Sequence, residues 1–413
     1  MFKKLISPFT CVIVVIIACL ITFVAVSSIM SKREEARINE LRDEWAGYTK
    51  YNTMNELASD DIERYNKLAK LIALIDNGTI HDYDKEDLWN KIYKTLPSSV
   101  GDKYGEYFTK AEYEAYVNSS SGMSAGIGIR IAKDDVTNGV YIHGVVTNSP
   151  AAESEIQIGD VIIEADGVNS DYDSIVEAII GEPETEVSLK VARGQEVIEM
   201  TIKRGLFPSE NVVYEKLEGN IAYIKIISFM DSTLDTQFKE KIALAQSEGC
   251  ESFIFDVRNN SGGFVEAACL VLDQLLPEGP IVYTTDAKGS TEVRSSDAEC
   301  IEAPMVVICN ENSASASELF VAALRDYKLT QSVGTKTMGK GSMQSVEEFK
   351  DGSALKYSSS LYTPPSKESY NGEGITPDHV VELDEKWQDN FFKMPREEDV
   401  QLLKAIELLN PAE

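Results

Sequence analysis

Histidine is scarce in this sequence, and its cysteines show no functional spacing. The 413 residues include only three histidines, His81, His143 and His379, and six cysteines. The cysteines have none of the spacings that zinc sites or disulfide frameworks use. Cys309 ends the apolar run PMVVIC, where a buried thiol is the usual outcome. The sequence therefore argues against a metal centre and against a cysteine nucleophile.

Positive charge is also in short supply. The chain has 39 lysines and arginines against 68 aspartates and glutamates, which gives a formal net charge of -29. Such a chain repels polyanions, and no basic stripe offsets that repulsion, so nucleic-acid binding is excluded as a function class. Solubility is the simplest explanation of the acidic excess. With 43% hydrophobic residues, the chain can bury a core and is expected to form two or three domains.

The first 30 residues differ in kind from the rest. Residues 8–30 contain no charged side chain and are long enough to span a bilayer. A cleaved signal peptide has a shorter apolar centre and a small-residue cleavage site, for which Ala25-Val26-Ser27 is a weak candidate. Residues 1–30 are therefore predicted to be a retained transmembrane helix. More basic residues follow the span than precede it, which favours a cytoplasmic body, but long domains translocate largely regardless of charge.

Three further regions follow the predicted anchor. Residues 31–117 are charged and predicted to be helical, with apolar side chains at helical spacing at Leu68, Leu71, Ile72 and Ile75. Residues 118–205 form short alternating strands separated by turn signals, which indicates a small β-rich domain. Residues 206–413 alternate strands with helices, which predicts an α/β core with largely parallel pairing. The fold class expected overall is α+β.

The stretch NENSASASELF, from Asn310 to Phe320, follows the buried strand PMVVIC and opens a predicted helix. In open α/β sheets, sites form beyond the carboxyl ends of the strands, so these serines stand at the usual position. Ser315 would lie at the helix start, where free N–H groups stabilise negative charge. It could equally be only a helix N-cap. A hydroxyl needs a base to react, and no histidine lies nearby in the sequence.

Lys340 is a candidate for that base. It stands between Gly339 and Gly341 in the stretch TKTMGKGSMQ, and the glycines allow a close approach of the backbone. Burial disfavours a charged lysine, and lowering its pKa from about 10.4 to about 7–8 costs roughly 4 kcal/mol. A neutral Lys340 could take the proton of Ser315. The alternatives are a surface lysine in a turn or a phosphate loop, although the P-loop spacing is missing.

A third stretch, DVRNNSGGFVE, breaks a buried strand at two glycines just before a helix. The backbone N–H groups of Gly262 or Gly263, with that of Ala316, could form an oxyanion hole. A tight turn at a helix start is the structural alternative.

In this order, the motifs DVRNNSGG, NENSASASE and GKGSMQ resemble those of the C-terminal processing peptidases, or tail-specific proteases. The similarity extends over most of the chain beyond the predicted anchor and includes GITPD at residues 374–378. The resemblance implies a serine endopeptidase with a Ser-Lys dyad, a PDZ domain, an α/β core and no cofactor. It assigns Ser315 as nucleophile, Lys340 as general base and Gln344 as the residue that orients the lysine amine.

Some residues depart from the family pattern or stay outside the predicted site. Ser261 stands where proline is more usual before the two glycines, which loosens the turn but keeps both amides. Glu318 and Asp326 lie at positions that the family also uses. Because ordinary helix polarity explains both carboxylates equally well, they are not included among the predicted catalytic residues.

The β-rich middle domain resembles a PDZ domain. SAGIGIRI matches the carboxylate-binding loop and the first groove strand, and NSPAAESEIQIGDVIIEADG matches the strand and loop around them. PDZ domains add a peptide as a strand and hold its terminal carboxylate with backbone N–H groups. The resemblance places Gly126, Ile127 and Gly128 in that loop. Glu155 and Gln157 replace smaller or apolar residues, which leaves ligand preference open, and the domain could instead only cover the active site.

The sequence therefore predicts a membrane-anchored serine endopeptidase that recognises the free C-termini of unfolded or partly folded proteins. The resemblance implies an extracytoplasmic catalytic body, and the helical region before the PDZ domain suggests a homodimer. The alternative is an inactive PDZ adaptor that tethers protein tails, against which the intact Ser315 and Lys340 argue.

Overall fold

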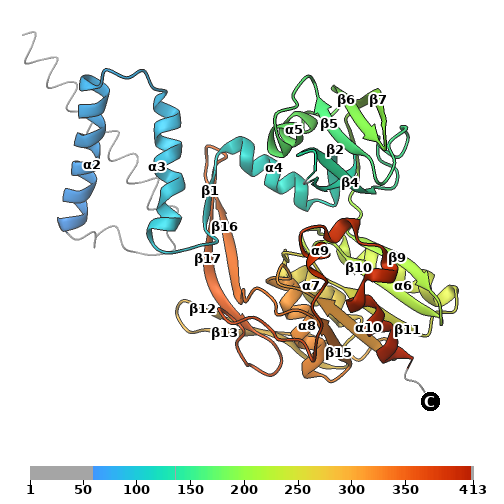
Figure 1. Cartoon of the computed structure of the whole chain (residues 1–413). Coiled ribbons are helices and arrows are strands. Elements are labelled where there is room, and N and C mark those ends of the chain that lie inside the picture. The colour runs from blue at the N-terminus through green and yellow to red at the C-terminus, as the bar shows by residue number, and fades with distance from the viewer. Residues whose placement is uncertain (1–58, 135, 411–413) are drawn as a thin grey trace, which may run out of the picture. The chain divides into compact units, whose positions relative to one another are not determined.

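The computed structural model describes residues 59–134 and 136–410 (Figure 1). The predicted anchor at residues 1–30 lies outside these ranges. Among the described residues, no helix combines the length and the apolar character needed to cross a membrane. The chain divides into two compact units, Met1–Lys85 and Glu86–Glu413.

The described part of the first unit is mainly the helix α2 (Ser59–Gly78). This helix contains the four apolar residues whose spacing predicted it. Leu71 and Ile75 are exposed there, at 49% and 41%. The helix α3 (Lys85–Ser99) begins at the boundary between the units, and α4 (Lys110–Ser120) follows β1 (Glu106–Phe108). A reciprocal capping box between Thr109 and Glu112 sets the start of α4.

The β-rich domain is a five-stranded antiparallel sheet in the order β3-β4-β5-β6-β7. Its strands are β3 (Ile129–Lys133), β4 (Val140–Val145), β5 (Val161–Ala165), β6 (Glu186–Arg193) and β7 (Glu196–Lys203). The helix α5 (Tyr172–Ile179) buries Ile175 and Ile179 in the core of this domain. The strand β2 (Met123–Gly126) precedes this sheet in the sequence and β8 (Gly205–Pro208) follows it, and the two strands pair with each other. Because β3 lies at the sheet edge, it can accept a further strand.

The α/β core contains a six-stranded sheet in the order β18-β15-β14-β11-β10-β9. Five of the strands pair in parallel, as predicted, and only β9 runs antiparallel. The strands are β9 (Val212–Leu217), β10 (Ile221–Ile226), β11 (Ser252–Asp256), β14 (Met305–Cys309), β15 (Thr330–Gly334) and β18 (His379–Val380). The helices are α6 (Leu234–Ser247), α7 (Val265–Asp273), α8 (Ala316–Asp326) and α10 (Val400–Leu409), with the short turns α9 (Glu385–Gln388), η2 (Phe391–Lys393) and η3 (Arg396–Glu398).

Strand β14 shows how the core holds this sheet. All five of its residues are buried, and successive side chains point to opposite faces of a strand. Val307 packs into a cluster with the helices α6, α7 and α8, whereas Ile308 packs into a second cluster with Leu402 of α10. Helices therefore cover both faces, which explains why a continuous apolar run, and not an alternating one, encodes this strand.

A second, antiparallel sheet was not predicted from the sequence. It has the order β1-β17-β12-β13, and β16 pairs with β17 (Figure 1). Its further strands are β12 (Gly279–Asp286), β13 (Thr291–Ser296), β16 (Ser342–Glu348) and β17 (Ala354–Thr363). Stretches such as TEVRSS and SMQSVEE are polar and partly exposed, so they lack the apolar signature of the core strands. The structure is thus a mixed α+β fold with a small five-stranded β domain.

Candidate active site

The three motifs meet because their strands are neighbours. Strands β11, β14 and β15 lie side by side in parallel, so their carboxyl ends share one edge of the sheet. The loops that leave these ends cover residues 257–264, 310–315 and 335–341. Together with the antiparallel sheet, the loops line a pocket of about 610 Å³ that includes Ser315 and Lys340. Gly262, Gly263 and Gln344 line the same pocket.

Ser315 has a strained backbone at the turn from strand to helix. Its φ and ψ are 57° and -118°, in the left-handed half of the map that non-glycine residues rarely occupy. Such strain clusters at functional sites, and a sharp strand-to-helix turn of this kind projects a nucleophile out of the sheet. Only 5% of Ser315 is exposed. A helix N-cap does not need this strained backbone, so the turn supports a functional role for Ser315 more strongly than capping alone would.

The three alternating serines have different partners. The hydroxyl of Ser313 donates to the carbonyl of Val257 at 2.7 Å, and that of Ser317 donates to the carbonyl of Asn260 at 2.9 Å. The outer two serines thus fasten the turn that carries Ser315 to the glycine-containing loop. The Ser315 hydroxyl lies in the pocket, 3.3 Å from the hydroxyl of Tyr362.

Lys340 is half-buried, and its side-chain amine lies over an aromatic ring. The Nζ atom is 4.2 Å from the ring centroid of Tyr104, and among the described residues no hydrogen bond joins it to Ser315. Burial lowers the pKa of Lys340, and the charge of Lys356 lowers it further, while Asp102 and Glu318 oppose the shift. The site therefore makes it easier for Lys340 to lose its proton than for a lysine in water.

Gln344 lies on β16 and is held by serines. Its amide nitrogen donates to the hydroxyls of Ser342 and Ser358, both at 3.2 Å. Within the described part of the chain, Gln344 shares the pocket with Lys340 but makes no hydrogen bond to it. Its role in orienting the amine stays a prediction.

Glu318 is the residue that the sequence reasoning underrated. Its fully buried carboxylate accepts hydrogen bonds from the backbone N–H groups of Ser315 at 2.9 Å and Lys340 at 2.7 Å. It also accepts from the N–H of Gly339 at 2.7 Å and from the hydroxyl of Thr337 at 2.5 Å. One carboxylate therefore fastens the backbones of the candidate nucleophile and of the candidate base to each other. The S-x-x-E spacing of a capping box was the available signal in the sequence.

The N–H groups of the glycine-containing loop are not equivalent. That of Gly262 donates to the side-chain oxygen of Asn260 at 2.9 Å. In residues 59–134 and 136–410, the N–H groups of Gly263 and Ala316 have no hydrogen-bond acceptor. Gly262 has a φ of +97°, and a Cβ there would lie 2.6 Å from the carbonyl oxygen of Ala314. The loop thus needs glycine for close packing at Gly262 and leaves Gly263 and Ala316 available to an oxyanion.

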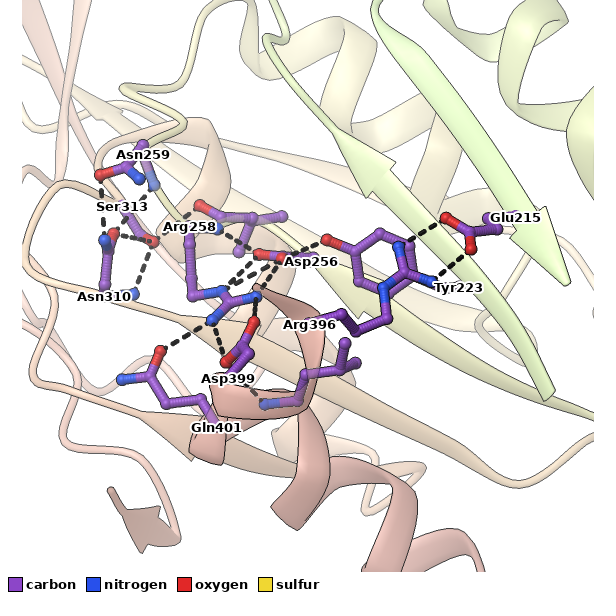
Figure 2. Close-up of polar contacts among 12 residues, drawn as sticks. Glu215, Tyr223, Asp256, Arg258, Asn259, Asn310, Ser313, Arg396, Asp399 and Gln401 are labelled. Carbon is purple, nitrogen blue, oxygen red and sulfur yellow. Dashed lines mark hydrogen bonds and ion pairs between the residues drawn. The ribbon is translucent and has the colours of Figure 1, made fainter. Parts of the chain in front are cut away.

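A buried ionic network anchors this loop to the C-terminal segment. Figure 2 shows the guanidinium of Arg258 between the carboxylates of Asp256 and Asp399, with N–O distances of 2.7 Å and 2.8 Å. Arg258 also donates to Gln401 at 3.0 Å. Burial alone would raise the pKa of Asp256, but Arg258 and Lys225 hold it below its usual value. The network fixes the start of the turn that leads to the oxyanion-hole candidates.

Gly126 ends β2, and Ile127 and Gly128 form the turn from β2 to β3 in the β-rich domain. Ile127 is buried, and its carbonyl accepts from the N–H of Ala151 at 2.7 Å. Gly128 has a φ of +84°, and a Cβ there would lie 2.1 Å from the Cβ of Ser149. The turn therefore depends on glycine and ends at the edge strand β3.

Comparisons with known proteins agree with this architecture. The profile of Peptidase family S41 matches residues 220–381, and a PDZ domain profile matches residues 141–193. A probable CtpA-like serine protease of Staphylococcus haemolyticus is 33% identical over 336 residues, which cover 79% of this chain and 66% of the relative. A relative of the same description from Staphylococcus aureus is 31% identical over 340 residues, covering 80% of this chain and 67% of the relative.

A solved structure shares the fold. A putative S41 protease from Bacteroides fragilis matches with a TM-score of 0.56 at 15% identity, covering 81% of this chain and 92% of that chain. The fold and the curated relatives define a serine-type peptidase with a PDZ domain. The chain belongs to peptidase family S41. It spans about two thirds of the length of the curated relatives.

Proposed function

We propose that the chain is a serine endopeptidase that uses a Ser-Lys dyad and recognises protein C-termini through its PDZ domain. The observation that supports it most is the pocket shared by Ser315, at a strained strand-to-helix turn, and a half-buried Lys340 whose pKa is lowered. Two free backbone N–H groups, of Gly263 and Ala316, lie on the loops beside Ser315 within the described chain.

The chemistry follows from these groups. Ser315 Oγ attacks the substrate carbonyl carbon while its proton passes to Lys340 Nζ, and the resulting oxyanion accepts from Gly263 and Ala316. Lys340 then returns the proton to the leaving amine as the C–N bond breaks, which leaves an ester on Ser315. Water attacks this ester, Lys340 takes a proton from the water, and Ser315 recovers a proton as the carboxylic acid product leaves.

For this cycle the lysine amine must leave the ring of Tyr104 and turn towards Ser315. The lysine side chain is long and flexible, so rotation about its side-chain bonds would supply such a turn. The main chain of Lys340 stays fastened to Ser315 through Glu318 during that turn. The side-chain carbonyl of Gln344, which lines the same pocket, would accept a hydrogen bond from the turned amine.

In the PDZ domain, a substrate tail would add as a strand to the free edge of β3. Its terminal carboxylate would accept from the N–H groups of the turn at residues 126–128. No cofactor takes part in this scheme.

The dependence on a free C-terminus is the test of this function. An unfolded protein substrate is expected to be cleaved at least about tenfold faster with a free terminal carboxylate than with an amidated one, because the amide loses the charge-assisted hydrogen bonds. Time courses of the two substrates, otherwise identical, give the comparison. Equal rates would contradict recognition of the C-terminus. Binding without cleavage and without labelling by a serine-reactive probe would indicate an adaptor instead of a peptidase.

A lysine base also predicts a pH dependence. Only the neutral amine accepts a proton, so kcat/KM is expected to rise with pH through the lowered pKa of Lys340 and to fall in acid. Lys356→Met removes a nearby positive charge and should move the midpoint to higher pH. Lys340→Arg, which cannot lose its proton, should be inactive throughout. A flat profile between about pH 5 and 9 would contradict the lysine base.

We also propose that residues 8–30 anchor the protein in a membrane, with the catalytic body on the extracytoplasmic side. The uncharged length of the segment and the usual location of the family support this arrangement. The exposed apolar side chains of α2, among them Tyr65, Leu71 and Leu74, support self-association as a homodimer.

A further inference from the structure

The hydroxyl of Tyr362 lies within hydrogen-bond distance of Ser315 Oγ and has no role in the proposed mechanism so far. Tyr362 lies near the end of β17, is 1% exposed, and its hydroxyl is 3.3 Å from Ser315 Oγ. The same hydroxyl donates to the backbone carbonyl of Lys340 at 3.0 Å. The backbone N–H of Tyr362 donates to the carbonyl of Gly341, also at 3.0 Å. Tyr362 therefore contacts both members of the proposed dyad.

A buried tyrosine needs one partner for its hydroxyl, and the Lys340 carbonyl already supplies it. The second acceptor, Ser315 Oγ, is not needed to satisfy the phenol. With one proton between two acceptors, the hydrogen bond is shared, and the longer contact to Ser315 is the weaker one in this state.

The balance between the two acceptors changes during the reaction. When Ser315 passes its proton to Lys340, negative charge develops on Oγ, and hydrogen bonds to charged acceptors are roughly twice as strong as neutral ones. The shared proton of Tyr362 then shifts towards Oγ. An interaction that strengthens only as the reaction proceeds lowers the barrier instead of merely tightening substrate binding. Negative charge develops on Oγ again when it leaves the ester during deacylation, and the hydrogen bond from Tyr362 strengthens in that step as well.

Tyr362 acts as a donor and not as a second base. Burial raises the pKa of its phenol above the ordinary value, so the hydroxyl keeps its proton across the working pH range.

We propose that Tyr362 is a catalytic residue that donates a hydrogen bond to Ser315 Oγ in the transition states of acylation and deacylation. This inference rests on the proposed Ser-Lys peptidase function.

Tyr370 provides a matched control. It is also buried, at 6% exposed, and its ring packs edge-on against Tyr362 with centroids 6.2 Å apart. Among the described residues, its hydroxyl makes no hydrogen bond to Ser315 or Lys340, and burial, together with its interaction with the phenol of Tyr362, raises the pKa of Tyr370. The pair Tyr362→Phe and Tyr370→Phe therefore removes the same atom from two neighbouring rings, of which only one touches Ser315.

The experiment measures kcat and KM of the full chain on an unfolded protein with a free C-terminus, and the labelling rate of Ser315 by a fluorophosphonate. Tyr362→Phe is expected to lower kcat and labelling about 10- to 100-fold with KM within about twofold. Tyr370→Phe is expected to keep both rates within about twofold of the wild type. A further variant, Tyr362→3,5-difluorotyrosine, keeps the ring shape with a stronger donor and is expected to be labelled at least as fast as the wild type.

Each other outcome has a definite meaning. Wild-type rates for Tyr362→Phe, equal losses in both phenylalanine variants, or a loss confined to KM would overturn the role of Tyr362 while leaving the peptidase intact. Slow labelling of the difluorotyrosine variant would also count against it. A wild-type chain that is neither labelled nor able to cleave would overturn the proposed function, and the role of Tyr362 with it.

Discussion

Replacing Ser315 by alanine is expected to lower cleavage by at least about 10⁴-fold. Without Oγ there is no acyl-enzyme, and removal of a nucleophile from a serine peptidase has effects of this size or larger. Cleavage of an unfolded substrate over time measures the loss, and mass spectrometry of the fluorophosphonate-treated chain shows whether any other residue reacts.

The neighbouring serines are the controls for this experiment. Ser313→Ala and Ser317→Ala each remove one of two donors to a buried carbonyl, because the carbonyl of Val257 also accepts from the N–H of Asn260 and that of Asn260 also accepts from the N–H of Ala314. They are expected to lower the free energy of unfolding by about 0.5–1.5 kcal/mol and still to allow labelling of Ser315. Labelling that persists in Ser315→Ala and disappears in one of the other two variants would reassign the nucleophile.

Replacing Arg258 by methionine is expected to destabilise the fold by about 3–5 kcal/mol. The substitution leaves the carboxylates of Asp256 and Asp399 buried without their cation, which costs more than the ion pair contributes. Arg258→Lys should recover only part of the loss, because an ammonium cannot reproduce the forked contacts to Asp256, Asp399 and Gln401. Urea unfolding followed by tryptophan fluorescence measures both variants.

Arg396 is the matched control for Arg258. It forms an ion pair with Glu215, but both side chains are about half exposed, at 42% and 51%. Exposed pairs contribute at most about 1 kcal/mol, so Arg396→Ala is expected to have little effect. If Arg258→Met and Arg396→Ala lowered the free energy of unfolding by similar amounts, the buried network would contribute no more to stability than an exposed ion pair.

The parallel core was predictable because its strands are encoded locally. PMVVIC and SFIFDVR are apolar runs long enough for one buried strand each, and amphipathic helices separate them. The antiparallel sheet was not predictable in the same way. Its strands β13 and β16 are polar and partly exposed, and they exist because β12 and β17 lie beside them. Pairing of that kind depends on neighbours distant in the sequence.

The residues of the candidate site also fall into two groups, those that the sequence indicated and those that only the structure revealed. The motifs themselves indicated Ser315, Lys340 and the glycine-containing loop, because serine, lysine and glycine at turns after buried strands suggest specific chemistry. Glu318 looked like an ordinary helical carboxylate until the structure showed it between the backbones of Ser315 and Lys340. Tyr362 stands in an unremarkable strand, and no local pattern connects it with Ser315, which follows β14 of the other sheet.

The sequence by itself determined which residues could react and which segments would be buried, since both follow from side-chain chemistry and local periodicity. Only the tertiary structure decided which groups face one another. It brought the ends of β11, β14 and β15 to one edge and placed the Lys340 amine over Tyr104. Within residues 59–134 and 136–410, it also left the N–H of Gly263 without an acceptor while that of Gly262 is bonded. Distances between groups far apart in the chain are set by the packing of whole elements, which no short stretch of sequence encodes.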